Sequence, residues 1–222
     1  MEKSIENIWK EGFLKSDALV APTINDLYNK KSIHIIDKFK RMFRINLIAI
    51  VVFSFFYLIA TFFMGIPLMG AMFFVALMAL VIVNRRLFKN LDKIDKGVDS
   101  YQYLKTFNQW TEEMIAINKK LSIVLYPTFF MSVVIGIWFK DAEGMPLGKR
   151  LVNEVLIGFP DIYLVLGVPL IGIIIIVLIV ALLAFFGGRI YQWDLNIVYG
   201  RVFRKLKELM TDIEELKKTT DI

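Results

Sequence analysis

Side chains that can do chemistry are few in this chain and stand far apart. Cysteine is absent and His34 is the sole histidine, so the sequence predicts no thiolate nucleophile and no structural zinc site. No phosphate-binding loop, HExxH, GxSxG or dinucleotide fingerprint occurs. We therefore expect neither an enzyme nor a cofactor or metal site. The carboxylates of the middle charged segment are expected on outer helix faces, and they are Asp92, Asp95, Asp99, Glu112 and Glu113.

Long apolar runs account for the 57% hydrophobic content, which exceeds the 45–50% typical of soluble domains. Three stretches lack any Asp, Glu, Lys or Arg: 45–84, 121–139 and 162–188. About 20 apolar residues make a helix that crosses a bilayer, and "GIP" at 65–67 divides the first stretch in two. The sequence thus predicts an all-α integral membrane protein with transmembrane helices near 46–64, 67–84, 121–139 and 163–187.

Basic residues are distributed unevenly along the chain, and this predicts the topology. Nine of the 27 Lys and Arg precede residue 45, eight lie in 85–120 and seven follow residue 188, but only three lie in 140–162. By the positive-inside rule both termini and the middle segment are cytoplasmic. The net charge of +6 is assigned to this bias and to anionic lipid, so the bilayer is the expected partner and nucleic acid is not.

Apolar residues recur every three or four positions outside the spans, which is typical of amphipathic helices that pack into a bundle. The C-terminal stripe is expected to comprise Ile190, Trp193, Ile197, Leu206, Leu209, Ile213 and Leu216. A helical hairpin is expected to turn near 97–100, residues 16–22 to join two N-terminal helices, and Gly187–Gly188 to bend the fourth helix. The predicted parts are cytoplasmic N-terminal helices (1–44), a transmembrane hairpin (45–84), a cytoplasmic hairpin (85–120), the third span (121–139), an external segment with an interfacial helix (140–162), the fourth span (163–188) and a cytoplasmic C-terminal helix (189–222).

Two prolines mark places where a span could bend. Pro127, in "YPT" of the third span, removes a backbone donor and frees a carbonyl. It is a candidate hinge or a packed static kink, and the static kink is favoured. Pro169 stands between Gly167 and Gly172 in the expected fourth span. It is either a hinge in a broken-helix site or part of a close helix approach, and close approach is favoured.

The stretch "IENIWKEGFL" (5–14) carries a short apolar face on a segment too polar to span a bilayer. The residues of this face are Ile5, Ile8, Trp9 and Phe13. A helix of about ten residues is marginal alone in water, so something must cover this face. Three coverings are open: the protein's own bundle, the lipid surface, or the groove of a partner protein.

The order of parts resembles a loose group of uncharacterised bacterial inner-membrane proteins with four spans, some described as anti-sigma-factor-like. The resemblance rests on "IWK" (8–10), a basic helix before the first span, the four spans, and the tail "YGRVFRKLKEL" (199–209). It implies that the cytoplasmic helices hold a sigma factor or a similar regulator at the bacterial inner membrane.

The leading functional hypothesis is a non-enzymatic membrane protein whose cytoplasmic helices dock or sequester a protein partner. The first alternative is an oligomeric channel or small-solute pathway, and the second is a membrane-structural protein. Homo-oligomerisation stays open. The side chains expected to line a pore are Ser54, Tyr57, Thr61 and Thr128.

Overall fold

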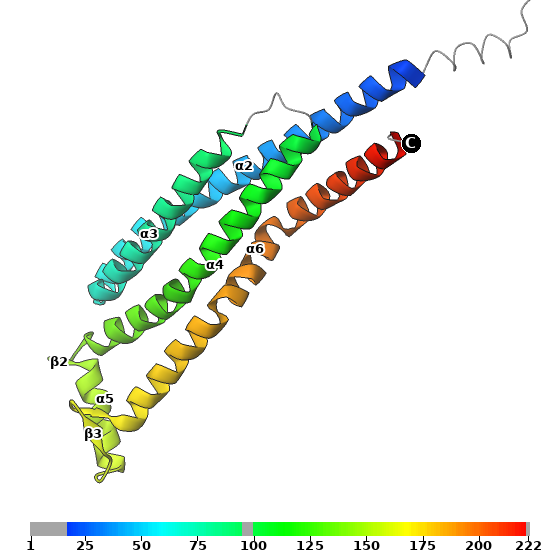
Figure 1. Cartoon of the computed structure of the whole chain (residues 1–222). Coiled ribbons are helices and arrows are strands. Elements are labelled where there is room, and N and C mark those ends of the chain that lie inside the picture. Colours follow the sequence, from blue (N-terminus) through cyan, green and yellow to red (C-terminus); the bar gives the residue numbers. More distant parts are fainter. Residues whose placement is uncertain (1–16, 95–99, 221–222) are drawn as a thin grey trace, which may run out of the picture.

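Long helices make up nearly all of the structure, a computed structural model that describes residues 17–94 and 100–220, with side chains from residues 30–94 and 101–215. The all-helical prediction is confirmed for this part of the chain (Figure 1). The described helices are α2 (Asp17–Phe63), α3 (Pro67–Leu91), α4 (Ser100–Trp138), α5 (Leu147–Gly158) and α6 (Leu170–Thr220).

Four of these helices are long and apolar enough to cross a membrane, by length and composition. Their apolar segments are 46–63 of α2, 67–84 of α3, 121–138 of α4 and 170–188 of α6. Side chains of these segments point outward: Phe56 is 68% exposed and Phe185 is 74% exposed. The rest of each helix carries most of the basic residues and is called its basic end, namely 17–45, 85–91, 100–120 and 189–220.

Two β-hairpins, which the sequence analysis did not predict, flank α5. β1 (Asp141–Ala142) pairs with β2 (Met145–Pro146), and β3 (Leu164–Val165) pairs with β4 (Val168–Pro169). The central residues of each turn have positive φ, as a tight hairpin turn requires. The predicted start of the fourth span at 163 was therefore wrong, because the second hairpin occupies 164–169 and α6 begins at Leu170.

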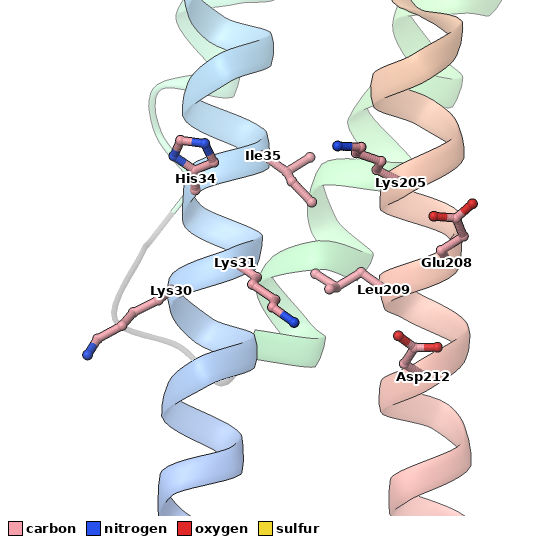
Figure 2. A pocket seen from close by; sticks show the side chains of 8 residues that line it. All are labelled: Lys30, Lys31, His34, Ile35, Lys205, Glu208, Leu209 and Asp212. Atoms are coloured by element: carbon pink, nitrogen blue, oxygen red, sulfur yellow. The ribbon is translucent and has the colours of Figure 1, made fainter.

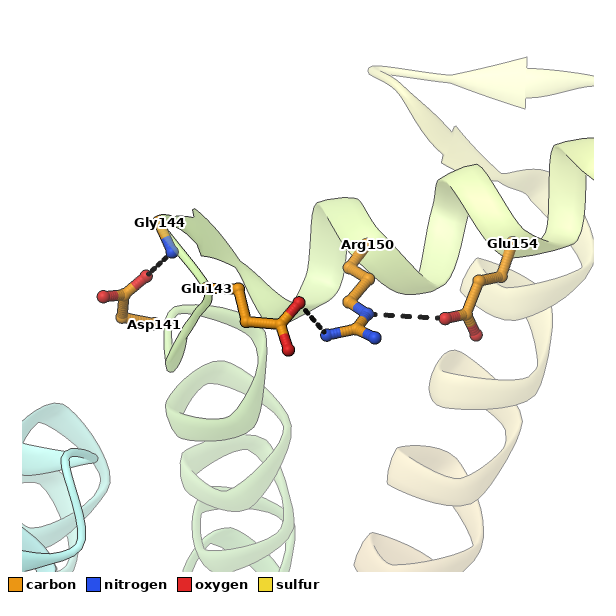
Figure 3. Close-up of polar contacts among 5 residues, drawn as sticks. All are labelled: Asp141, Glu143, Gly144, Arg150 and Glu154. Atoms are coloured by element: carbon orange, nitrogen blue, oxygen red, sulfur yellow. Dashed lines mark hydrogen bonds and ion pairs between the residues drawn. The ribbon is translucent and has the colours of Figure 1, made fainter.

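Polar contacts attach the first hairpin to α5 (Figure 3). The Asp141 carboxylate accepts a hydrogen bond of 3.1 Å from the Gly144 backbone N–H inside the turn. Arg150 contacts Glu143 of the turn at 3.1 Å and Glu154 of its own helix at 3.5 Å. Because these side chains are largely exposed, each ion pair adds little stability alone, but together they orient α5 on the hairpin.

Helix boundaries differ from the predicted ones at two other places. Residues 17–22, expected to join two helices, already belong to α2, which begins at Asp17. α3 ends at Leu91, about two turns before the expected turn at 97–100, and the chain turns at 92–94. α4 begins at Ser100, as the expected return helix requires.

The core of the molecule lies between the basic ends, where aromatic rings from three helices surround Phe39. Phe39 of α2 is fully buried and packs edge-on against Phe107 and Trp110 of α4, with ring centroids 5.3 and 5.8 Å apart. Tyr199 and Phe203 of α6 lie against the same ring at 5.1 and 5.8 Å. Such pairs add about 0.5–1.5 kcal/mol each beyond their area burial, so this cluster fixes how the helices meet.

The stripe predicted for the C-terminal helix was right at Leu206, Leu209 and Ile213 and wrong at Trp193 and Ile197, while the side chain of Leu216 lies outside the described ones. Trp193 and Ile197 are 71% and 83% exposed. The buried residues of α6 in this region are Leu195, Tyr199, Val202, Leu206, Leu209 and Ile213. Apolar side chains also occupy the outward face here, close to the apolar segment, so hydrophobicity alone did not mark the inner face.

A glycine brings α4 and α6 together where the apolar segments begin. A Cβ built on Gly187 would lie 2.9 Å from the Ser122 carbonyl oxygen, whereas one on Gly188 would lie 3.9 Å from Lys119. The helix runs unbroken through both positions, so Gly187 serves close approach within a continuous helix. At Gly167 and Gly172, where close approach was predicted, an added Cβ meets nothing within 4 Å.

We expect Gly187→Ala to lower the melting temperature of the purified protein in detergent, because the new methyl group pushes against the α4 backbone. Overpacking of this kind costs about 1–3 kcal/mol, against a helix-propensity gain of about 1 kcal/mol. Gly188→Ala is the matched control and should leave the melting temperature unchanged or raise it. Equal effects of the two substitutions would contradict the close approach at Gly187.

Candidate functional site

A layer of polar side chains lies where the apolar segments meet the basic ends. All four long helices contribute to it. We call it the boundary layer, and its members are Asn46, Asn84, Asn118, Tyr126, Asp194 and Tyr199.

The centre of the boundary layer is a reciprocal amide pair between α3 and α4. Asn84 Nδ2 donates to Asn118 Oδ1 at 2.9 Å, and Asn118 Nδ2 donates to Asn84 Oδ1 at 3.0 Å. Each amide also donates to a carbonyl one turn back in its own helix, Leu80 for Asn84 and Met114 for Asn118. Both side chains are buried, so every one of these bonds replaces lost hydration.

Two further hydrogen bonds connect α6 to the other helices. Asn46 of α2 donates to the Tyr199 hydroxyl at 3.1 Å, and the Tyr126 hydroxyl of α4 donates to the Asp194 carboxylate at 2.7 Å. Burial raises the pKa of the Tyr199 phenol, while the hydrogen bond from Asn46 lowers it in part. Tyr199 is therefore a neutral hydroxyl at physiological pH and acts as a hydrogen-bonding group rather than an acid.

A small, partly open pocket of about 120 Å³ lies within this layer. Its polar lining consists of Asn46, Asn84, Asn118, Tyr191, Asp194 and Tyr199. A pocket of this size with several polar partners is suited to ordered water. Asp194 is the one charged group among the described residues that line it, and no cluster of three or more metal-ligating side chains occurs in the described part of the chain. The arrangement connects the four long helices by hydrogen bonds.

A second feature is a charged groove of about 470 Å³ between the basic ends of α2 and α6 (Figure 2). Ile35 and Leu209 face each other across it, and Lys205 projects from α6 toward α2. Positively and negatively charged side chains surround the apolar strip that Ile35 and Leu209 form. The lining residues are Lys30, Lys31, His34, Ile35, Lys205, Glu208, Leu209 and Asp212.

The residues predicted to bind a partner, Ile5, Ile8, Trp9 and Phe13, lie outside the described residues. Their role stays a prediction.

Of the two predicted hinges, one lies inside a helix and one does not. Pro127 lies within α4, and the hydroxyl of Thr128 donates to the Val124 carbonyl at 2.8 Å. The freed carbonyl at Ile123, one turn before the proline, is therefore not the group that Thr128 satisfies. Pro169 lies in β4, opposite Leu164, so the expectation that it stands within the helix of the fourth span was wrong. A hinge at Pro127 stays a prediction.

Three of the four side chains expected to line a pore hydrogen-bond to their own helix. Ser54 donates to Val51 at 2.7 Å, and Thr61 donates to Tyr57 at 2.9 Å. Thr128 does the same to Val124. Ser54 and Thr61 are also buried, so within one chain these hydroxyls do not form a hydrated path.

Most of the boundary layer escaped the sequence analysis, although one signal marks it. Each asparagine stands between an apolar run and basic residues, as in "RIN" (44–46), "NRR" (84–86) and "NKK" (118–120). An amide at the end of an apolar run is placed to bond across helices at the depth where water is first excluded.

Comparison with known proteins gave no match: no family model, no curated protein and no solved structure shows significant similarity to this chain.

We expect the Asn84–Asn118 pair to show strong coupling in a double-mutant cycle. Asn84→Ala and Asn118→Ala each strand the other amide in a buried site, which costs about 1–3 kcal/mol. The double variant removes both groups and should cost clearly less than the two single costs added together. The measurement is the unfolding free energy of the purified protein in mixed micelles.

The control for this cycle is Asn108→Ala, because Asn108 bonds only within α4, to Glu112 at 2.9 Å. It should change stability little. Additive costs at Asn84 and Asn118 would show that the reciprocal pair does not connect the helices energetically.

Proposed function

We propose that this chain is a non-enzymatic multi-span protein of the bacterial inner membrane whose basic ends face the cytoplasm and dock a protein partner. The membrane placement is supported by the four apolar segments, whose side chains are exposed over most of their surface. In water that exposure would be unfavourable, whereas in lipid it is the expected arrangement.

The orientation is supported by charge. The basic ends hold 19 of the 27 Lys and Arg residues, whereas the α5 region between the third and fourth apolar segments holds three. The two hairpins and α5 lie at the end of the molecule opposite the C-terminus of α6 (Figure 1). Cytoplasmic basic ends satisfy the positive-inside rule.

The single observation that carries the partner-binding proposal is the charged groove between α2 and α6. Among the described residues the aromatic core is covered by its own helices, whereas this groove leaves Ile35 and Leu209 accessible between the basic ends of α2 and α6. Lys30, Lys205 and Asp212 line it with charges of both signs, which is suited to an amphipathic helix with matching charges. The resemblance to anti-sigma-factor-like membrane proteins makes a sigma factor the proposed partner.

The topology can be measured by single-cysteine labelling, because the native chain has no cysteine. Asn153 on α5 and Lys207 on α6 are both exposed. We expect Asn153→Cys to react with a membrane-impermeant maleimide in intact spheroplasts, and Lys207→Cys to react only after permeabilisation. Labelling of Lys207→Cys in intact spheroplasts, or protection of Asn153→Cys, would overturn the proposed orientation.

Partner binding can be measured with a bacterial two-hybrid screen of the full chain against each sigma factor of the host. We expect one sigma factor to give a signal that Lys205→Glu reduces at least tenfold, because the substitution reverses a charge in the groove. Lys207→Glu, two residues away and outside the groove, is the matched control and should retain the signal.

The N-terminal segment belongs to the same screen. Trp9→Ala with Phe13→Ala should also reduce the signal if this segment contributes to docking, whereas Glu6→Ala with Lys10→Ala should not. Absence of a signal with every sigma factor, or signals that none of these variants alters, would reject the proposal.

A further inference from the structure

A groove of about 430 Å³ runs between α2 and α3, on a different face from the charged groove. We call it the α2–α3 groove. Aliphatic side chains line its length, and basic side chains lie around one end beside Phe88. Its lining residues are Arg44, Leu47, Ile48, Val51, Val52, Val81, Arg85, Phe88 and Lys89.

The basic end of this groove gathers three positive charges from two helices. Arg44, Arg85 and Lys89 are all exposed, and none of them forms an ion pair with an acidic side chain among the described residues. The nearest described carboxylate in the sequence, Asp92, is paired instead with Lys40 at 3.1 Å. The Arg44 guanidinium lies over the Phe88 ring, 5.6 Å from its centroid, which restricts its position at the mouth of the groove.

The basic and aliphatic parts of the groove follow one another in the order of the headgroup and acyl chains of a lipid molecule. Arg44 comes directly before the first apolar segment, and Arg85 comes directly after the second. From this level the aliphatic residues Ile48 and Val52 continue along α2 into the apolar region, one turn apart. In the proposed membrane placement, the basic side chains of the groove lie at the depth of the lipid headgroups, and its aliphatic side chains lie at the depth of the acyl chains.

We propose that the α2–α3 groove binds an anionic phospholipid. The phosphate is held by Arg44, Arg85 and Lys89, and one acyl chain lies along the aliphatic lining. Guanidinium groups suit phosphate because their N–H donors match its oxygens in pairs. An inference of a bound lipid rests on the proposed membrane placement, but it is independent of the proposed protein partner.

A second apolar groove, on α6 beside Phe186, is a poorer match to the same ligand. Its lining holds one cation, Arg189, whose guanidinium lies 5.6 Å from the centroid of the Phe186 ring. One arginine offers a single positive charge to a phosphate, against three positive charges at the α2–α3 groove. The charge complementarity thus selects the α2–α3 groove.

The test uses the purified full chain in maltoside micelles with added dioleoyl phosphatidylglycerol or dioleoyl phosphatidylcholine, and melting is followed by tryptophan fluorescence. We expect phosphatidylglycerol to raise the melting temperature by about 3 °C or more beyond phosphatidylcholine, because a ligand that binds only the folded state stabilises it. Inorganic phosphate alone should have no effect, since it lacks the acyl chain.

Two triple variants with the same change in net charge separate the groove from general electrostatics. Arg44→Gln, Arg85→Gln and Lys89→Gln together should abolish the difference between the two lipids. The control combines Lys38→Gln, Arg41→Gln and Arg86→Gln, which are exposed basic residues of the same two helices outside the groove, and it should preserve the difference. Equal melting temperatures of both triples in phosphatidylcholine verify that the groove triple is folded.

Native mass spectrometry supplies a second readout, with one retained phosphatidylglycerol per chain expected for the parent and the control triple only. The proposal is overturned if both lipids stabilise equally, if the groove triple keeps the difference, if both triples lose it, or if inorganic phosphate reproduces the shift. No partner protein is present in this experiment, so its failure would leave the two-hybrid result standing, and a failed screen would leave the lipid result standing.

Discussion

The aromatic cluster around Phe39 is the interaction on which the helix arrangement depends. Apolar segments gain little by leaving lipid for each other, because hydrocarbon is as apolar as leucine. In agreement with this, only 6% of the most apolar stretch of α6 is buried. In the proposed membrane placement water surrounds the basic ends, so burying Phe39, Phe107 and Tyr199 there gains the full hydrophobic stabilisation. The main buried cluster therefore lies between the basic ends, whereas contacts between the apolar segments, such as that of Phe73 with Phe129 at 4.8 Å, are fewer and more exposed.

The hydrogen bonds of the boundary layer continue the contacts between the helices from the aromatic cluster toward the apolar segments. The Trp110 indole N–H of α4 donates to the Leu87 carbonyl of α3 at 3.0 Å. Along α3, Leu87 lies about one turn from Asn84, which forms the amide pair with Asn118 of α4. The register of α3 on α4 is thus specified first by an aromatic donor and then by two amides. Not every polar group is matched: the hydroxyl of buried Tyr103 has no hydrogen-bond partner among the described residues, and burial together with the Asp37 charge raises its pKa to about 12.

Composition and charge were sufficient to predict the four long helices and the buried positions Leu206, Leu209 and Ile213, because these depend on local patterns. The α6 start was missed because residues 164–169 are apolar throughout, and only the positive φ at Leu166 and Gly167 makes them a hairpin. Trp193 was placed on the wrong face because apolar residues are stable on either face near lipid. The Asn84–Asn118 pair depends on residues 34 positions apart, which no local pattern contains.

α2 stands between the two candidate binding surfaces, and this has a mechanical consequence. Its basic end forms one wall of the charged groove through Ile35, while Arg44 and Ile48, about two to four turns further along, line the α2–α3 groove. The fully buried Phe39 lies between them and is held by α4 and α6. A displacement of α2 about this point would alter both grooves, because the helix lines each of them. In the proposed function, binding of a lipid at the α2–α3 groove and of a protein partner at the charged groove would therefore be coupled through α2.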